Sequence, residues 1–153
     1  MALVNYHDAI MYVSDANILR QSNAWLNDQC INFACKLFEH DRDYMKINGP
    51  SGARFIDPSV VSFMKLQCED DDEFQDLAFG MDLKDSDYIV FLPINDSDSL
   101  LEASCSHWSL LIIFSFHSIA YHVDSYHHNQ PGAGKQLDQA TKTAQSFSKL
   151  LKW

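Results

Sequence analysis

His107 and Asp124 are the two side chains whose types and positions most directly indicate proton transfer. They stand at opposite ends of a segment whose two arms are rich in β-branched and aromatic residues, with a short turn at His117-Ser118. That pattern predicts a β-hairpin, and the two ends of a hairpin lie side by side. A carboxylate beside a histidine fixes the imidazole tautomer and stabilises the cationic form. We therefore expect this pair to be two members of a nucleophilic triad.

The composition favours one domain with a hydrophobic core. The chain has 153 residues, of which 46% are hydrophobic, and no apolar run approaches membrane-spanning length. The N-terminus lacks the basic and apolar pattern of a secretory signal. Cys30, Cys35, Cys68 and Cys105 form no Cys-x-x-Cys pair, which favours free thiols in a reducing compartment. We expect a soluble intracellular protein, in the cytoplasm, the nucleus or both.

The charge excludes one class of partner. A formal net charge of −10 argues against nucleic acid, because neutralising phosphates requires clustered Lys and Arg. An acidic surface suits a basic protein partner instead. The acidic run Glu69–Glu73 lacks the glycine turn and the spaced ligands of a calcium loop, so we interpret it as the solvated start of a helix.

The N-terminal half predicts helices introduced by short polar turns. We expect an extended segment at Asn5–Val13 and then a turn marked by Ser14, Asp15 and Asn17. A helix should begin at Asn27 or Asp28 and end near Glu39 or His40. Its buried stripe should consist of Cys30, Phe33, Ala34, Leu37 and Phe38.

Two further helices and several loops complete the pattern. After a loop at Asn48–Gly52, Asp57-Pro58 should open a helix that turns Val61, Met64 and Leu66 inward, and the helix after the acidic run should stop at Gly80. Tyr88–Ile94 should be a buried strand, followed by a polar loop, Asn95–Ser104. After a loop at His127–Gly134, a final helix at 135–151 should bury Leu137, Ala140, Ala144, Phe147, Leu150 and Leu151.

Four short motifs occur in the order seen in one family of peptidases. They are Trp25-Leu26-Asn27-Asp28, Phe91-Leu-Pro-Ile-Asn, His107-Trp108-Ser109-Leu110 and Val123-Asp124-Ser125. In this order they resemble the ubiquitin-like-protein proteases, the cysteine peptidases that process and deconjugate SUMO- and Nedd-type modifiers. Within the family the chain looks most like the deneddylase branch, because the similarity begins almost at residue 1 and the Asn95–Ser106 loop is long. The similarity covers essentially the whole chain.

The resemblance implies an α+β fold of the papain-like cysteine-protease type and a role for each matched residue. His107 would be the general base and acid, and Asp124 would orient it and stabilise the imidazolium. Trp25 and Trp108 would line a narrow tunnel for the modifier's Gly-Gly tail, because only glycine lets backbone and aromatic face approach so closely. Asp28 would contact the backbone of the tail or the surface of the modifier.

The same resemblance implies a reaction and partners. The reaction would be thiol-dependent cleavage after the Gly-Gly tail of a ubiquitin-like modifier, of the Nedd type in preference to SUMO. The partners would be that modifier and its conjugates, such as cullin-type proteins. The enzyme would act as a monomer, with no cofactor and no metal.

The sequence departs from the family at the nucleophile. In the family a Gln-x-x-x-x-Asp-Cys-Gly segment follows the helix after the triad aspartate, and no such segment follows Asp124 here. Cys105 is a poor substitute, because no helix N-terminus is predicted beside it to lower its pKa. We therefore expect residues 1–153 to be a single incomplete protease domain with its C-terminal part missing. Such a chain should expose apolar surface on the hairpin and the final helix, and should fold marginally.

Two other functions fit parts of the sequence. A catalytically inactive module could still bind the Gly-Gly tail through Trp25, Asp28 and Trp108. A metal-dependent hydrolase would need ligands of the type that zinc prefers, and His107, His122, Asp124, His127 and His128 are the available set. These five residues match no recognised ligand spacing.

Overall fold

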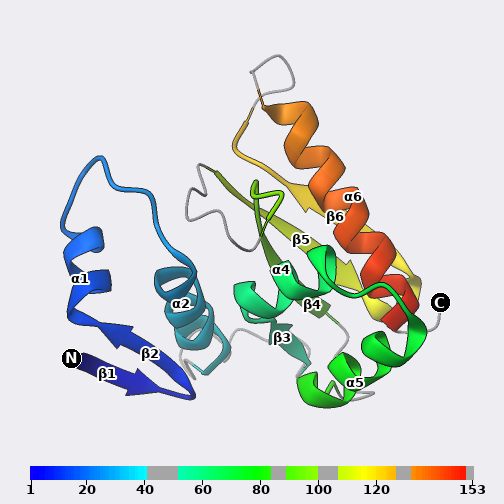
Figure 1. The fold of residues 1–153 in the computed structure, drawn as a ribbon, viewed down its shortest axis with the longest axis horizontal. Helices are drawn as coiled ribbons and strands as arrows, with labels where there is room; N and C mark the ends of the chain where they lie inside the picture. The colour runs from blue at the N-terminus through cyan, green and yellow to red at the C-terminus, as the bar shows by residue number, and fades with distance from the viewer. Residues whose placement is uncertain (41–51, 84–88, 100–106, 127–131, 151–153) are drawn as a thin grey trace.

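Residues 1–40, 52–83, 89–99, 107–126 and 132–150 are described by a computed structural model (Figure 1). Several predicted features lie outside these residues, namely most of the Asn48–Gly52 loop, Tyr88, Cys105, the His127–Pro131 part of the last loop, and Leu151. Within the described residues there is a two-stranded sheet with the order β1-β2 and a four-stranded sheet with the order β3-β4-β5-β6. The mixed α+β class is confirmed.

The N-terminal segment is a small β-hairpin that runs directly into a helix. Strands β1 (Ala2–Tyr6) and β2 (Ala9–Tyr12) are antiparallel, and the turn at His7 and Asp8 has positive φ angles of 46° and 67°. The single extended segment that we predicted is therefore a hairpin. The predicted turn at Ser14–Asn17 is also wrong, because helix α1 occupies Val13–Leu19.

The cause of the second error is a carboxylate at the start of α1. Asp15 Oδ2 accepts a hydrogen bond from the backbone N–H of Tyr12 at 2.7 Å, so Asp15 closes the first turn of the helix. Asp, Ser and Asn are typical of both turns and helix starts, so their presence does not distinguish the two.

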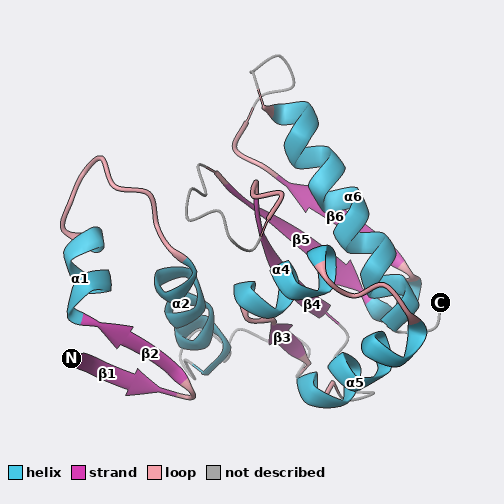
Figure 2. Cartoon of the chain, viewed as in Figure 1, coloured by secondary structure: helices cyan, strands magenta, loops and turns pink. Residues whose placement is uncertain are grey.

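Helix α2 spans Asp28–His40, which confirms the predicted bounds. Asn27 caps it, since Asn27 Oδ1 accepts a hydrogen bond from the N–H of Cys30 at 3.0 Å. The predicted buried stripe is only partly correct, because Leu37 and Phe38 are exposed while Asn32 and Cys35 are buried. The physical reason is that α2 lies between two bodies, with β2 on one side and β3 and α4 on the other, and so has no single buried face (Figure 2).

Helices α4 (Pro58–Leu66) and α5 (Asp71–Met81) begin at aspartate caps. Asp57 Oδ1 accepts the N–H of Ser59 at 2.8 Å, and the side chain of Asp70 caps α5 in the same way. Val61 and Met64 are buried as predicted, whereas Leu66 is only half-buried. The predicted stop at Gly80 is wrong by one residue: the helix continues through Met81, and Asp82 takes the left-handed conformation, with φ of 46°.

The larger sheet contains the predicted hairpin. Strand β4 (Ile89–Asn95) lies between β3 (Ala53–Phe55), which runs parallel to it, and β5 (Trp108–Phe114), which runs antiparallel. A short 3-10 turn, η1 (Ser115–His117), joins β5 to β6 (Ile119–Val123). The hairpin is therefore confirmed. The prediction omitted β3, which has only three residues with an arginine at the centre.

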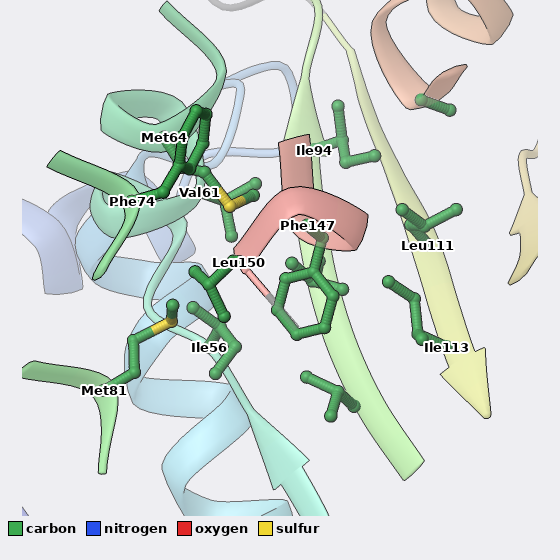
Figure 3. Packing of buried hydrophobic residues seen from close by; sticks show 13 residues of the cluster. Ile56, Val61, Met64, Phe74, Met81, Ile94, Leu111, Ile113, Phe147 and Leu150 are labelled. Atoms are coloured by element: carbon green, nitrogen blue, oxygen red, sulfur yellow. The ribbon is translucent and has the colours of Figure 1, made fainter. Parts of the chain in front are cut away.

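Helix α6 (Ala133–Leu150) packs across the sheet and completes the core (Figure 1). Phe147 is fully buried and projects between the strand residues Leu111 and Ile113 and the helical residues Val61 and Met64 (Figure 3). The predicted face of this helix is rotated, because three polar residues are buried and Leu137 is 56% exposed. The buried polar residues are Gln136, Gln139 and Thr143.

Apolar side chains remain exposed on the hairpin and on α6, as expected. They are Phe116, Ile119, Tyr121, Val123 and Leu137. Between β5, β6 and α6 runs a groove of about 400 Å³, lined in part by Leu111, Ala120, His122, Leu137, Ala140 and Ala144. Among the described helices, none combines the length and the hydrophobicity needed to cross a bilayer. Marginal folding stays a prediction.

Candidate active site

The hairpin presents its chemically active side chains on the face that is packed by α6. In the observed register Leu111 lies opposite His122 and Leu110 opposite Val123. Because side chains alternate across a strand, His107, Ser109 and Leu111 share one face with His122 and Asp124. Continuing the register sets Ser109 opposite Asp124, so residues 107 and 124 are diagonal neighbours across the two strands.

His107 and Asp124 are in direct contact. His107 Nε2 lies 2.5 Å from Asp124 Oδ1, and the two side chains are only 7% and 11% exposed. Since Nε2 faces a carboxylate, it carries the proton in the neutral imidazole, and Nδ1 is the basic nitrogen that a nucleophile would address. The sequence prediction that this pair lies side by side is confirmed, while its catalytic role stays a prediction.

The Asp124 carboxylate is held in its charged form. Burial by itself would raise its pKa, but hydrogen bonds from the Tyr126 backbone N–H and from His107, together with the charge of the imidazoles, lower the pKa below its ordinary value. The Tyr126 N–H lies 3.0 Å from Oδ1, the same oxygen that faces His107. As a carboxylate, Asp124 accepts the hydrogen bond from His107 Nε2.

Two further residues fix the position of His107. The Tyr126 ring stacks on the imidazole, with centroids 3.6 Å apart and an interplanar angle of 5°. On the backbone, Asp96 Oδ1 accepts the N–H of His107, and the Asp96 N–H donates to the His107 carbonyl, both at 3.2 Å. These contacts restrain the ring and the main chain separately, so the imidazole is held before any substrate is bound.

The short segment that carries Asp96 is itself clamped between two helices. Lys65 of α4 donates from Nζ to the carbonyls of Asn95 and Ser97, at 3.3 and 2.9 Å. From α6, Gln139 Nε2 donates to Asp98 Oδ1 at 2.6 Å, and Lys135 forms an ion pair with the same carboxylate. Helices far apart in the sequence therefore help to determine where His107 lies.

Trp108 connects the hairpin to the segment that precedes α2. Its indole Nε1–H donates to the carbonyl of Leu26 at 2.8 Å. This bond brings the Trp25–Asp28 segment to the start of β5, although the two are more than 80 positions apart in the sequence. Trp25 itself is 61% exposed. An exposed indole in the segment that Trp108 holds is available to contact a bound peptide.

Asp28 has a different environment from the other predicted site residues. It is the first residue of α2, and burial together with the charge of Asp57 raises its pKa. Among the described residues, no hydrogen bond or ion pair links Asp28 to His107 or Asp124. The structure thus brings together the dyad, Trp108 and the Trp25 segment, and it does not join Asp28 to the dyad.

A second histidine on the same face has a neutral partner. His122 Nε2 lies 2.9 Å from Ser109 Oγ, and Gln136 Nε2 of α6 donates to that hydroxyl at 2.5 Å. Burial lowers the pKa of His122, with the nearby charge of Asp124 opposing the shift and that of His107 adding to it. No group of three or more metal-ligating side chains occurs among the described residues, and His127 and His128 lie outside them.

The curated relatives that match this chain are named as sentrin-specific or NEDD8-specific proteases. Probable sentrin-specific protease 8 of Dictyostelium discoideum is 37% identical over 112 residues, which is 72% of this chain and 45% of that protein. Sentrin-specific protease 8 of Homo sapiens is 29% identical over 135 residues, covering 88% of this chain and 60% of that protein. NEDD8-specific protease 1 of Arabidopsis thaliana is 28% identical over 139 residues, covering 90% and 58%. The chain thus spans 45% to 61% of the curated relatives that it matches.

The chain belongs to the ubiquitin-like-protein protease family, in its deneddylase branch. Solved structures of SUMO protease Ulp1, one with its catalytic cysteine oxidised to a sulfenic acid, share the fold. The TM-score is 0.66 at 20% sequence identity, over 99% of this chain and 60% of the Ulp1 chain. No model of a known protein family matches the chain.

The chemistry of this family requires a reactive thiolate, and the described cysteines are poor candidates. Burial raises the pKa of Cys35 to about 11, and burial also raises the pKa values of Cys30 and Cys68. A raised pKa keeps a thiol protonated near neutral pH, where it is a weak nucleophile. Cys105 lies outside the described residues.

The sequence analysis did not identify several residues that position the two histidines of this candidate site. Tyr126 and Asp96 hold His107, and Gln136 connects α6 to the second histidine. The position of Tyr126, two residues after Asp124, is a usable signal, because aspartate side chains often accept the backbone N–H two residues on. For Gln136 we find no comparable signal, since a glutamine on a helix normally faces solvent.

Proposed function

We propose that this chain contributes the base, the orienting carboxylate and the tail-binding residues of a cysteine-type protease that cleaves after the Gly-Gly tail of a Nedd-type modifier. The observation that carries the proposal is the contact between His107 and Asp124 beside Trp108. The names of the relatives, which specify sentrin and NEDD8, support the substrate class.

In the proposed reaction each member of the dyad has one role. His107 Nδ1 would accept the proton of a cysteine thiol, and the thiolate would attack the carbonyl carbon of the terminal glycine. The C–N bond to the leaving amine then breaks as His107 returns the proton, which leaves a thioester that water hydrolyses. Asp124 keeps Nε2 protonated and stabilises the imidazolium between these transfers.

Burial raises the pKa values of the three described cysteines, which disfavours the thiolate, and Cys105 is a poor substitute because no helix N-terminus is predicted beside it. We therefore propose that residues 1–153 alone bind the modifier and cleave it weakly or not at all. The partners in the cell would be the modifier and its conjugates, such as cullin-type proteins, in the cytoplasm or nucleus.

Calorimetric titration with NEDD8 and with SUMO tests the substrate assignment. We expect NEDD8 to bind more tightly, and we expect removal of its two terminal glycines to weaken binding at least tenfold, equivalent to about 1.4 kcal/mol. Trp25→Ala should reproduce much of that loss, while Phe79→Ala, a change at an aromatic residue that is 90% exposed on α5, serves as the matched control. Equal binding of intact and tail-less NEDD8 would contradict the proposal.

A catalytically inactive modifier-binding module is the second candidate, favoured by the raised pKa values of the described thiols. A NEDD8 probe with an electrophile at its C-terminus distinguishes the two candidates. Covalent labelling that is lost in His107→Ala demonstrates a competent cysteine, whereas reversible binding without labelling demonstrates a binding module.

A further inference from the structure

Two cross-strand pairs on the hairpin have the same geometry and different chemistry. His107 contacts Asp124, and Ser109 contacts His122. When the register of β5 and β6 is continued to His107, just before β5, and to Asp124, just after β6, each pair joins diagonal neighbours on the same face of the hairpin. Thus two histidines flank one carboxylate, and the structure gives each a different hydrogen-bond partner.

The orientation of the Gln136 amide is determined by its surroundings. Gln136 Nε2 lies 3.1 Å from the carbonyl oxygen of Ile94 and 2.5 Å from Ser109 Oγ. A backbone carbonyl only accepts hydrogen bonds, so the group that faces it must be the NH₂. The same NH₂ has a second hydrogen, and this hydrogen is donated to the Ser109 hydroxyl.

The direction of the next hydrogen bond follows from that assignment. The Ser109 oxygen accepts from Gln136, and Ser109 is buried, so its own hydrogen needs an acceptor. Within the described part of the chain, the acceptor that the structure gives this hydroxyl is His122 Nε2, at 2.9 Å. An Nε2 that accepts carries no hydrogen, so His122 is the neutral imidazole with its proton on Nδ1.

We propose that Ser109 and Gln136 are positioning residues of the active site: they hold His122 neutral, so that His107 alone shares a proton with Asp124. A cation on His122 would compete for the Asp124 carboxylate and would repel the imidazolium that forms on His107. Gln136 donates to Ser109, and Ser109 in turn donates to His122 Nε2. Because a hydrogen already lies between Ser109 Oγ and His122 Nε2, a second proton on Nε2 is disfavoured and His122 stays neutral.

The charges around His122 agree with a neutral ring. Burial lowers its pKa, and the two charged groups that act on it are Asp124, on its own side of the hairpin, and His107 across from it. Helix α6 packs against β6, but the α6 residues that line the groove beside His122 are uncharged. The four charged residues of α6 have other partners: Lys142 pairs with Asp138, Lys135 with Asp98, and Lys149 lies over the Phe74 ring.

The orientation of the buried Gln136 amide has an energetic cost. It is 1% exposed, and its Oε1 has no hydrogen-bond partner among the described residues. A buried amide oxygen without a partner is unfavourable. The side chain nevertheless keeps this orientation, in which its NH₂ reaches both Ile94 and Ser109.

The test is nitrogen NMR of the histidine side chains in the intact 153-residue chain, assigned with His107→Gln and His122→Gln. We expect His122 at pH 7 to be neutral and protonated on Nδ1, with a pKa below that of a free histidine. Finding the proton on Nε2, or finding a cationic ring at pH 7, overturns the proposal. This measurement needs no substituted positioning residue, so it holds even where a variant folds poorly.

Two substitutions then test the assigned cause. Ser109→Ala and Gln136→Leu should each increase the proton affinity of His122 at least about threefold, equivalent to about half a pKa unit. The matched control is Gln139→Leu, which removes an equally buried glutamine from the same helix without touching Ser109, and it should leave His122 unchanged. Identical His122 titrations in the Gln136 and Gln139 variants would overturn the role of Gln136.

The role of the Gln136–Ser109–His122 hydrogen bonds in catalysis rests on the proposed function, but the measurement of the His122 tautomer does not. The titrations use no modifier, so they succeed or fail independently of NEDD8 binding. A correct His122 tautomer in a chain that ignores NEDD8 would refute the proposed function and leave the hydrogen-bond assignment intact.

Discussion

His107 and His122 lie on the same face of one hairpin and differ in what each faces. The first contacts a carboxylate and is stacked on Tyr126, and the second contacts a hydroxyl that already accepts a hydrogen bond from Gln136. His107 lies just before β5, and His122 lies within β6. Burial lowers the pKa of His122, and its partner is a neutral hydroxyl, whereas His107 faces a carboxylate. Burial and the two partners together favour a neutral His122.

The two histidines are also held in place by different residues. His107 is held by two nearby residues: Asp96 accepts a hydrogen bond from its backbone N–H, and the Tyr126 ring stacks on its imidazole. His122 contacts Ser109, which accepts a hydrogen bond from Gln136 of α6. The buried face of α6 otherwise packs on the core through Phe147 and Leu150 (Figure 3). Both histidines therefore depend on α6: His122 through Gln136 and Ser109, and His107 through the contacts of Gln139 and Lys135 with Asp98 in the segment that carries Asp96.

The largest expected effect is on stability when the acidic partner is removed. Asp124→Ala leaves His107 buried without its carboxylate and should lower the free energy of unfolding by about 3 kcal/mol. Ser109→Ala removes a neutral partner and should cost about 1 kcal/mol. Urea denaturation at pH 7 measures both, and equal losses would erase the distinction between the two pairs.

The two pairs should affect the free energy of unfolding in different pH ranges. The folded pKa of His122 lies below its ordinary 6.5, so the unfolded chain binds more protons and stability falls as the pH drops below about 6.5. The folded pKa of Asp124 lies below 3.8, so its contribution persists above that value and is lost as the pH falls through the folded pKa. His122→Asn should flatten only the first decline in a denaturation series from pH 7 to pH 3.

A smaller effect should follow from removing the ring that stacks on His107. Tyr126→Phe keeps both the ring and the backbone N–H and should change the free energy of unfolding by less than about 0.5 kcal/mol. Tyr126→Ala loses the stack and should cost about 1 kcal/mol. If thermal denaturation shows the same loss for both variants, the hydroxyl and not the ring supports the site.

Another small effect is expected where the hairpin meets the N-terminal segment. Trp108→Phe deletes the indole N–H that donates to Leu26 and should cost about 0.5 to 1 kcal/mol. Hydrogen exchange should speed up in residues 22–27, while exchange in β6 stays unchanged. Trp25→Phe, at a largely exposed position, is the control and should leave exchange in the same segment as it was.

Sequence alone could predict the first histidine pair and not the second. The β-branched and aromatic residues of the two arms predicted the hairpin, and a hairpin necessarily brings His107 towards Asp124. The contact of Ser109 with His122 depends on the strand register, and the donor Gln136 depends on how α6 rotates against the sheet. Helical periodicity favours apolar residues such as Leu137 for the buried face, yet Leu137 is exposed and Gln136 is buried.

The N-terminal region shows the same limit. Asp15 is typical of turns by residue type, but its carboxylate closes the first turn of α1, and this depends on where the preceding strand ends. The bounds of α2 were predictable, because Asn27 is a local cap. Its buried surface was not, since α2 packs between β2 and β3. Local signals thus determined where elements begin, and tertiary contacts determined which faces are buried.

The most direct test of the account is to record the histidine side-chain NMR signals of the chain with and without NEDD8. We predict that the imidazole signals of His107 shift on saturation with NEDD8, that those of His122 do not, and that NEDD8 without its terminal glycines shifts neither. Saturating NEDD8 that leaves His107 unchanged, or that shifts His122 instead, would contradict the assignment of His107 as the base beside the modifier's tail.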